Sequence, residues 1–289
     1  MPKNINNARK VKSVSKSVPT MEGAGVHLHR AFGFREAPGL DPFLLLDDFR
    51  SDVPEHYLKG FPWHPHRGIE TITYVLKGDV EHGDSMGNRG DIGDGDVQWM
   101  TAGSGIIHQE MPKGDAEGRM WGFQLWANLP ASHKMMEPRY RDVKSSQIPE
   151  VKLGDGVRIK VICGEVDGTV GPVRDIVTLP EYLDVFVPAG RLYEHDTVPG
   201  HTVFAYVIDG MGSFEFDLKS NVGNGTLVRF GDGDHVIAGT KDEHMRMLLC
   251  TGRPIGEPVA WRGPIVMNTE DELRLAFDEY AAGTFIKHG

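Results

Sequence analysis

Cysteine, long hydrophobic runs and an excess of basic residues are all missing from this sequence. Cys163 and Cys250 are its only cysteines. A disulfide framework is therefore excluded, and we expect two buried, reduced thiols in a cytoplasmic protein. No hydrophobic run approaches the roughly 18 residues that a membrane-spanning helix needs, and the first residues lack the apolar stretch of a signal peptide. We expect neither membrane insertion nor export.

The charge balance argues against direct binding of nucleic acids. The chain carries 41 acidic and 31 basic residues, for a net charge of −10, and its isoelectric point is about 5.7. Broad nucleic-acid binding needs a basic face for the phosphates. Residues 1–18 hold five basic residues and no acid. A nuclear signal is one interpretation of this segment, and we favour a mobile tail that leads into a first strand.

Length and composition favour two domains built from short strands. The chain has 289 residues, which is too long for one small β-barrel and suits two of them. Glycine is abundant, with 36 residues beside 18 prolines. Many of the glycines stand in turn-like clusters, as is typical of antiparallel strands joined by tight turns.

The strongest chemical signal lies where a turn runs into a predicted strand. Residues 69–75 are mainly β-branched or aromatic, which predicts a strand. Side chains two positions apart in an extended segment point to the same face, so His64 and His66 project together. A later segment places His108 and Glu110 at the same spacing. If the two segments are neighbours in a barrel, three imidazoles and one carboxylate converge on a metal site.

Outside this motif the sequence predicts one helix and offers one weaker histidine pair. Residues 269–272 read Thr-Glu-Asp-Glu, a capping box that starts a helix, because the threonine and the last glutamate can satisfy each other's open N–H groups. Hydrophobic residues at helical spacing follow, and Gly283 offers a stop. His27 and His29 also lie two apart, but no second pair of ligands stands near them in sequence.

An internal repeat predicts the architecture. Thr-Tyr-Val-Leu-Lys-Gly at 73–78 matches Ala-Tyr-Val-Ile-Asp-Gly at 205–210. Gly-Asp-Gly-Asp at 93–96 recurs at 231–234, and an apolar strand ending in Ala-Gly follows each copy. Two matches in the same order indicate two copies of one β-barrel.

The same alignment of the two copies provides an internal control for the metal site. Opposite the four candidate ligands the second copy carries Asp196, Val198, His244 and Arg246. An arginine opposite Glu110 would repel a metal ion. We therefore expect the chemistry in the first barrel and a structural second barrel.

Several blocks that span nearly the whole chain resemble the pirin family. The His-x-His motif and its downstream glycines are similar to the short motifs of the cupin superfamily, and the match to pirins is carried by residues 41–45, 64–68, 98–103, 107–112 and 263–269. The resemblance implies an all-β fold of two tandem antiparallel β-barrels, a jelly-roll bicupin, with a short C-terminal helix. We place the metal-binding barrel at 1–135, and the C-terminal barrel, with a degenerate site and the helix, at 136–289.

The resemblance also bears on the choice of carboxylate ligand. In most cupins this ligand belongs to the first motif, which here supplies Glu70, and Glu70 shares the strand parity of His64 and His66. In pirins it belongs to the second motif, which maps onto Glu110. Strand geometry permits either glutamate, and the resemblance favours Glu110 together with the three histidines (His64, His66 and His108). Glu70 would then orient a histidine through a hydrogen bond.

Ligand type and resemblance together indicate the cofactor and the reaction. Three imidazoles and a carboxylate suit iron, manganese, nickel or copper better than calcium or magnesium. The resemblance implies a mononuclear iron, as Fe(II), and a quercetin 2,3-dioxygenase reaction on a flavonol-like substrate and O2. Glu110 would be the general base for the flavonol 3-hydroxyl as well as a ligand, and O2 would open the heterocycle with release of CO. Two interpretations stay open for four hydrophobic residues: they line the pocket, or each is ordinary barrel core. These residues are Phe43, Trp63, Met100 and Ile107.

Two other classes of function stay open at this point. The family resemblance also allows a regulatory binding protein, similar to a nuclear transcriptional coregulator, whose protein partner would respond to the oxidation state of the iron. Such a role would place the chain in a nucleus. The third class is a different cupin reaction on another small molecule.

Overall fold

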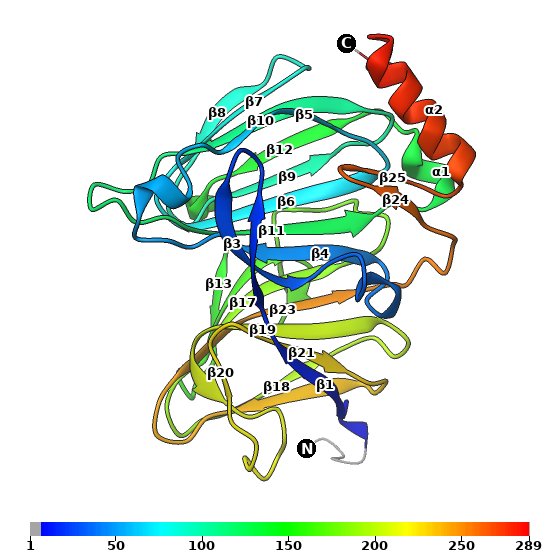
Figure 1. The fold of residues 1–289 in the computed structure, drawn as a ribbon. Helices are drawn as coiled ribbons and strands as arrows, with labels where there is room; N and C mark the ends of the chain where they lie inside the picture. Colours follow the sequence, from blue (N-terminus) through cyan, green and yellow to red (C-terminus); the bar gives the residue numbers. More distant parts are fainter. Residues whose placement is uncertain (1–6, 289) are drawn as a thin grey trace. The chain divides into compact units, whose positions relative to one another are not determined.

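The computed structural model describes residues 7–288, and most of the regular structure in this range is β-strand. Its α-helices there are α1 (Ala131–Lys134) and α2 (Glu270–Ala281) (Figure 1). The described chain divides into two compact units. We call residues 18–145 with 255–288 the first barrel unit, and residues 7–17 with 146–254 the second barrel unit.

Each unit contains a segment that is distant in sequence from its remaining residues. Strand β1 (Val11–Lys16) pairs with β21 (Thr226–Phe230) in the second barrel unit, and the C-terminal segment 255–288 belongs to the first barrel unit. The sequence analysis divided the chain into two consecutive segments after residue 135. This boundary between domains stays a prediction.

The first barrel unit consists mainly of two antiparallel sheets. The larger sheet has the order β12 (Arg139–Val143), β9 (Val97–Thr101), β6 (Ile69–Lys77), β11 (Trp121–Asn128), β4 (Phe43–Asp48), β3 (Val26–Phe32), β2 (Val18–Glu22). The smaller sheet has the order β5 (Phe61–His66), β10 (Ile106–Pro112), β7 (Val80–Asp84), β8 (Arg89–Ile92).

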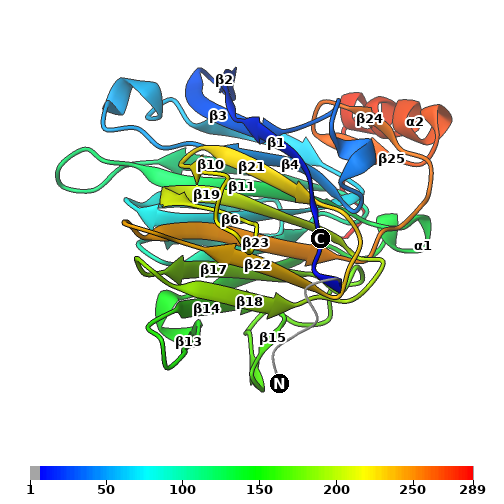
Figure 2. The ribbon, with the colours of Figure 1, turned by 90° about the horizontal axis from the view of Figure 1, so that it is seen from below.

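The second barrel unit repeats this plan. Its main sheet has the order β1, β21, β19 (Thr202–Gly212), β23 (Met245–Gly252), β17 (Glu181–Val187), β14 (Arg158–Cys163), β13 (Glu150–Lys152), and Figure 2 shows several of these strands side by side. The shorter strands pair as β18 (Leu192–Asp196) with β22 (His235–Gly239), β15 (Glu165–Val166) with β16 (Thr169–Val170), and β20 (Val222–Gly223) with β19.

The matching strand orders confirm two copies of one β-barrel and correct the alignment between them. The Gly95 amide donates to the Val75 carbonyl, and the Gly225 amide donates to the Val207 carbonyl, both at 2.8 Å. Gly225 is therefore the equivalent of Gly95. The Gly-Asp-Gly-Asp at 231–234 follows β21, whereas the one at 93–96 precedes β9, so the second sequence match was a coincidence of turn residues.

The C-terminal segment confirms the predicted helix. Thr269 accepts a hydrogen bond from the Glu272 amide, and the Glu272 carboxylate accepts one from the Thr269 amide, which completes the capping box. Ahead of the helix, β24 (Ala260–Arg262) and β25 (Ile265–Met267) form a hairpin. Leu273 and Ala276 of the helix are buried against this hairpin in a small hydrophobic cluster.

The two units differ in what fills their interiors. One hydrophobic cluster of mostly aliphatic side chains, including Val185, Val207 and Leu249, fills the second barrel. In the first barrel the hydrophobic side chains fall into separate clusters, one of them around Val75 and another around Met100. Polar side chains occupy much of the remaining interior. Buried polar groups cost free energy unless they are paired, so these positions require a functional explanation.

Candidate metal centre

Three histidines from two neighbouring strands meet in the first barrel. β5 supplies His64 and His66, and β10, paired with β5, places His108 directly opposite His64. One ring nitrogen from each histidine lies within 4.8 Å of the others, and the Nε2 atoms of His64 and His66 are 3.1 Å apart. The i, i+2 spacing of a strand thus brings the two β5 imidazoles to one point, as the sequence predicted.

The protonation of these rings leaves lone pairs directed at one another. Nδ1 of His64 bonds the Pro62 carbonyl at 2.8 Å, and Nδ1 of His66 bonds the Pro264 carbonyl at 3.0 Å. Because a carbonyl oxygen only accepts, both Nδ1 atoms carry the proton, and both Nε2 atoms carry lone pairs. Their separation of 3.1 Å suits two neighbouring ligands of one ion, since a metal–imidazole bond is about 2.1 Å long.

Burial supports the same conclusion for His108. Desolvation lowers the pKa of His66 and of His108 well below the usual histidine value, and the neighbouring imidazoles add to the effect. Both rings are therefore neutral near pH 7 and available as ligands. Neither ring nitrogen of the fully buried His108 has a hydrogen-bond partner in the described residues. A transition-metal ion at this point would satisfy these groups, so the residues fit the implied metal.

The two candidate glutamates lie on different sheets. Glu110, on β10, faces the same cavity as His64 and His66, and its Oε1 accepts a hydrogen bond from Thr73 at 2.7 Å. Its carboxylate is not part of the three-histidine group. Glu70, on β6, is fully buried and accepts a hydrogen bond from Thr101 at 2.7 Å. Desolvation raises the pKa of Glu70, which favours a neutral carboxyl group over a metal-binding carboxylate.

Sequence reasoning missed two polar residues behind the histidines. His82 and Asp84, on β7, are buried and lie opposite Glu110 and His108 in the β7–β10 ladder. His82 Nε2 is 3.3 Å from Asp84 Oδ2, and its ring centroid is 5.4 Å from that of His108. The signal was present, because His82 and Asp84 have the same two-residue spacing as the His64 motif.

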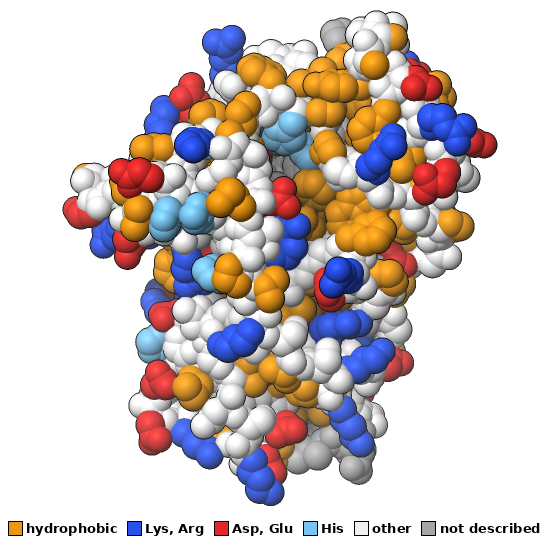
Figure 3. Space-filling model, in the orientation of Figure 1, with side chains coloured by type: hydrophobic (Ala, Val, Ile, Leu, Met, Phe, Trp, Pro, Cys, Tyr) orange, Lys and Arg blue, Asp and Glu red, His pale blue; other side chains and the backbone are white. Residues whose placement is uncertain are grey.

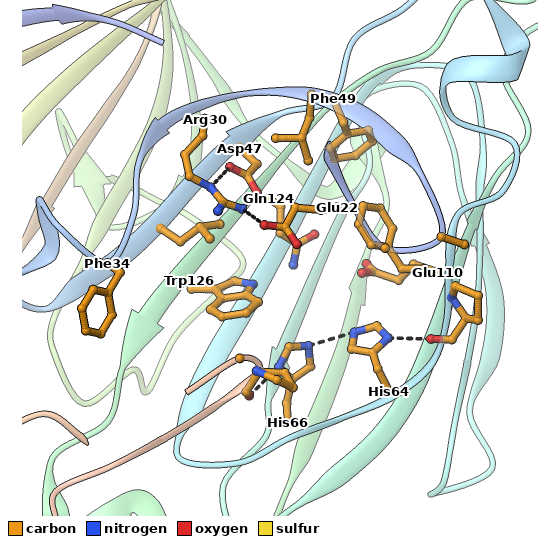
Figure 4. Close-up of a pocket in the computed structure, with 18 of the residues that line it drawn as sticks. Glu22, Arg30, Phe34, Asp47, Phe49, His64, His66, Glu110, Gln124 and Trp126 are labelled. Atoms are coloured by element: carbon orange, nitrogen blue, oxygen red, sulfur yellow. Dashed lines mark hydrogen bonds and ion pairs between the residues drawn. The ribbon is translucent and has the colours of Figure 1, made fainter. Parts of the chain in front are cut away.

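A cavity of about 670 Å³ opens beside the histidines. Figure 3 shows its mouth as a hollow that is bordered by hydrophobic side chains and has histidine at its edge. The close-up in Figure 4 shows His64, His66 and Glu110 on one part of its wall and Trp126 beside it. Its other hydrophobic lining residues include Leu28, Leu45, Phe49 and Phe61.

The four residues expected to line this cavity do not do so. Phe43 and Met100 are buried in the barrel core, Ile107 packs against the cluster beside the C-terminal helix, and Trp63 is 52% exposed. The lining interpretation was wrong, and the alternative of ordinary barrel core holds for Phe43 and Met100. Alternation along a strand predicts two faces but does not say which face meets the cavity.

A row of polar side chains crosses the larger sheet, and nothing in the sequence had indicated it. The strand ladders place Arg30 opposite Asp47, Asp47 opposite Gln124, Gln124 opposite Thr73, and Thr73 opposite Gln98. We call these five residues the polar row. Three of them, Arg30, Asp47 and Gln124, line the cavity. Thr73 connects the row to the candidate ligand Glu110.

The Arg30 end of the polar row is strongly hydrogen-bonded. The Arg30 guanidinium donates from Nε to Asp47 Oδ1 at 2.8 Å and from Nη2 to Asp47 Oδ2 at 2.7 Å. Nη2 also pairs with Glu22 at 2.9 Å. Desolvation nevertheless raises the pKa of Asp47 to about 6. The pair is thus a bidentate ion pair whose carboxylate is held in a poorly solvated place.

The C-terminal segment supplies part of the surroundings of the histidines. The Val266 amide donates to the Arg67 carbonyl at 3.1 Å, directly after His66. Gly68 has a φ of +78°, and a Cβ there would lie 2.0 Å from the Val266 carbonyl oxygen. Buried Lys134 donates to both the Gly68 and the Val266 carbonyls. This turn therefore needs glycine, and the C-terminal segment fixes the backbone that carries His66.

The second barrel lacks this ligand set, although the equivalent positions differ from those predicted. With Gly225 equivalent to Gly95, the β18–β22 ladder places Tyr193, His195 and Ala238 where the first barrel has His64, His66 and His108. His195 bonds Tyr193 and Glu181 at 3.0 and 3.2 Å. His244 and Arg246, predicted opposite His108 and Glu110, lie elsewhere, on or beside β23. In the described residues the three-histidine group is the sole cluster of this kind.

The weaker histidine pair does not form a metal site. The ring of His27 stacks on that of His56, with centroids 4.3 Å apart, and neither His27 nor His29 belongs to a group of three or more candidate ligands in the described range. The described residues also contain no helix that is long and apolar enough to cross a membrane.

Strand order and site together define the class of this protein, a two-barrel cupin whose first barrel carries a three-histidine group suited to a metal ion. Family models agree with that definition. The model described as pirin matches residues 25–127, and the model described as the pirin C-terminal cupin domain matches residues 182–286. The chain belongs to the pirin family.

Individual relatives resemble the chain over most of its length. It is 45% identical over 278 residues to a pirin-like protein of Caulobacter vibrioides, covering 96% of this chain and 99% of that protein. A solved quercetin 2,3-dioxygenase from Acinetobacter baumannii matches with a TM-score of 0.88 and 30% identity, over 96% and 98% of the two chains. A bacterial pirin from Escherichia coli, solved with nickel(II), shares the fold at a TM-score of 0.64 and 20% identity, over 84% and 98%.

Proposed function

We propose that this chain is an oxygenase of the quercetin 2,3-dioxygenase type, with iron held by His64, His66, His108 and Glu110. The observation that carries the proposal is the three-histidine group, whose lone pairs face one another at the wall of an aromatic-lined cavity. Similarity to the Acinetobacter baumannii enzyme over nearly the full chain supports the choice of reaction.

The metal ion, when bound, supplies a Lewis acid that favours the deprotonated form of a chelating hydroxyl group and a site for oxygen chemistry. Glu110 is the group in the cavity wall that accepts the hydroxyl proton. Thr73 holds Glu110 Oε1, which leaves Oε2 free to receive that proton or to bind the ion.

The cavity suits a flat aromatic substrate. Its volume of about 670 Å³ lies within the range of roughly 300–1,000 Å³ that small-molecule sites occupy. Trp126, Phe49 and Phe61 offer ring faces and edges for stacking, and these hydrophobic walls exclude water from the reacting ring. The chain's own residues thus bind the substrate, orient it and hold its proton.

Metal analysis followed by an oxygen-electrode assay tests this proposal. We expect purified protein loaded with Fe(II) to bind one ion per chain and to consume O2 with quercetin, releasing CO. Loading with nickel(II) provides a second measurement of metal binding, because imidazole ligands accept either ion. His66→Ala should lose both the ion and the oxygen uptake.

A matched control comes from the second barrel. His195 is the structural equivalent of His66 and bonds only side chains there, so His195→Ala should retain the ion and the activity. Oxygen uptake by His66→Ala at the parental rate, or loss of the ion from His195→Ala alone, would contradict the proposal.

A further inference from the structure

The rim of the cavity carries a charged cluster at one end of the polar row. We call Glu22, Arg30 and Asp47 the acidic end, because two carboxylates flank a single guanidinium. Their side chains are 44%, 24% and 7% exposed, so the cluster runs from the rim toward the interior. All three residues line the cavity.

This cluster retains groups that a ligand could bind. Arg30 uses Nε and Nη2 for its bonds to Asp47 and Glu22, which leaves its Nη1 for a ligand. Glu22 uses one carboxylate oxygen, and its second oxygen has no partner in the described residues. A cavity wall that needed only stability would hold hydrophobic residues here, because a buried ion pair adds little to the free energy of folding.

The acidic end and the histidines belong to different sheets of the barrel. Arg30 and Asp47 come from β3 and β4 of the larger sheet, whereas the histidines come from β5 and β10 of the smaller sheet. Figure 4 shows Arg30, Asp47 and Glu22 at the opposite end of the view from His64 and His66, with Trp126 between the two groups. A flat ligand that lies along Trp126 is therefore placed between the two groups.

The two ends have opposite charge when the site holds a divalent ion. At the metal end, the two positive charges of the ion exceed the single negative charge of Glu110. At the acidic end, the two negative charges of Glu22 and Asp47 exceed the single positive charge of Arg30. An anionic chelating group is favoured at the first end. At the second end, hydrogen-bond donors are favoured and a carboxylate is repelled.

We infer that the acidic end is the specificity determinant of this site. It selects aromatic substrates that carry hydroxyl groups on the ring farthest from the metal, and it rejects substrates that carry a carboxylate there. The inference rests on the proposed function for the orientation of the ligand. The hydroxyl groups donate to Glu22 and Asp47, and Arg30 keeps both carboxylates in place.

Equilibrium binding of three probes to metal-loaded protein without oxygen tests the inference. The probes are quercetin, 3,5,7-trihydroxyflavone, which differs from quercetin only in lacking the hydroxyls of the distal ring, and a 3,5,7-trihydroxyflavone with a carboxylate on that ring. Quenching of tryptophan fluorescence gives each dissociation constant, since Trp126 lines the cavity. We expect quercetin to bind about tenfold more tightly than 3,5,7-trihydroxyflavone, the effect of a hydrogen bond to a charged group. The carboxylate probe should bind weakest.

Two variants then separate recognition from structure. Glu22→Gln and Asp47→Asn should each lower the preference for quercetin severalfold and should strengthen binding of the carboxylate probe. A merely structural role would not produce this opposite response. Glu22 is partly exposed, so Glu22→Gln still tests the inference if Asp47→Asn does not fold. Glu117→Gln removes a charge from an exposed pair outside the cavity and should change no ratio.

The outcomes distinguish this inference from the proposed function. Turnover of quercetin and 3,5,7-trihydroxyflavone with equal affinities, unchanged in both variants, overturns the inference and leaves the proposed oxygenase activity intact. The expected binding preferences without any oxygen uptake contradict the proposed oxygenase activity and support the acidic end as the specificity determinant. Failure of all three probes to bind overturns the inference.

Discussion

Thr73 Oγ1 lies 2.7 Å from Glu110 Oε1 and 2.8 Å from Gln124 Oε1, although a hydroxyl has only one proton to donate. A hydrogen bond to a carboxylate is the stronger of the two, so the proton belongs to Glu110. The Gln124 amide then turns its nitrogen toward Thr73 and its oxygen toward the cavity, an orientation that hydrogen bonding alone decides. Thr73 thereby positions the carboxylate that faces the metal site.

Replacing Thr73 should therefore slow the reaction without removing the metal. Thr73→Val keeps the shape of the side chain and deletes the hydroxyl, and we expect kcat to fall about tenfold, or about 1.4 kcal/mol, with KM nearly unchanged. Thr73→Ser restores the donor and should restore most of the rate. Metal analysis of both variants is the control, and an unaltered kcat in Thr73→Val would refute the positioning role.

Removal of the metal should lower the thermal stability of the parent protein. It should not change the stability of a variant that lacks one of the metal ligands. A ligand present at a hundredfold excess over its dissociation constant stabilises the folded state by about 2.7 kcal/mol, which corresponds to roughly 5–10 °C in a domain of this size. A chelator should abolish this difference in the parent. In His108→Ala the chelator should have no effect, and calorimetry with and without chelator measures both.

The ion pair between Arg67 and Glu279 should anchor the C-terminal helix. Arg67 Nη1 donates to Glu279 at 2.7 Å, and the two side chains are 2% and 19% exposed. Glu279→Gln leaves a buried guanidinium without its carboxylate and also breaks the ion pair with Lys287 at 2.7 Å. We expect a loss of about 3 kcal/mol in the free energy of unfolding. Asp271→Asn, which breaks the exposed pair with Arg274, should cost less than about 0.5 kcal/mol. Urea unfolding compares them; equal losses would argue against an anchoring role.

Lys134 should make the stability of the first barrel unit depend on pH. Burial lowers the pKa of Lys134 to about 7, whereas an unfolded lysine titrates near 10.4. Between these values the unfolded chain binds more protons than the folded one, so the free energy of unfolding rises with pH from about 7 to about 10. Below pH 7 the cost of the buried charge is constant.

The variant Lys134→Met isolates this effect. It removes the titrating group, along with hydrogen bonds to Gly68, Asn128 and Val266, so it should be less stable at every pH. The difference between parent and variant should widen by a few kcal/mol as the pH rises through this window. A difference that stays constant with pH would show that Lys134 keeps its ordinary pKa in the fold.

Local spacing in the sequence was enough to predict that His64 and His66 point to the same face and that a helix lies near the C-terminus. His64 and His66 share a face because successive side chains of a strand alternate, and the capping box of Thr269 and Glu272 is a contact between near neighbours in sequence. The similarity of Thr-Tyr-Val at 73–75 to Ala-Tyr-Val at 205–207 likewise predicted two barrels. Each of these signals can be recognised in short, continuous stretches of the sequence.

Contacts between distant strands could not be predicted in the same way. The polar row joins residues of five strands between positions 30 and 124, and its alignment depends on register and on bulges that no local pattern specifies. The repeat alignment failed for a related reason. Turn residues recur in any protein with many hairpins, so Gly-Asp-Gly-Asp matched where the strands did not.

The contact of His66 with the Pro264 carbonyl has a consequence for biosynthesis. About two hundred residues separate the two partners in the chain, so a ribosome must release nearly the whole polypeptide before the imidazole acquires the neighbour that sets its tautomer. A metal ion that arrived while the first barrel unit was still being synthesised would find His66 without this hydrogen-bond partner. We therefore expect metal loading to follow synthesis of the chain, because the segment that carries Pro264 is made near its end.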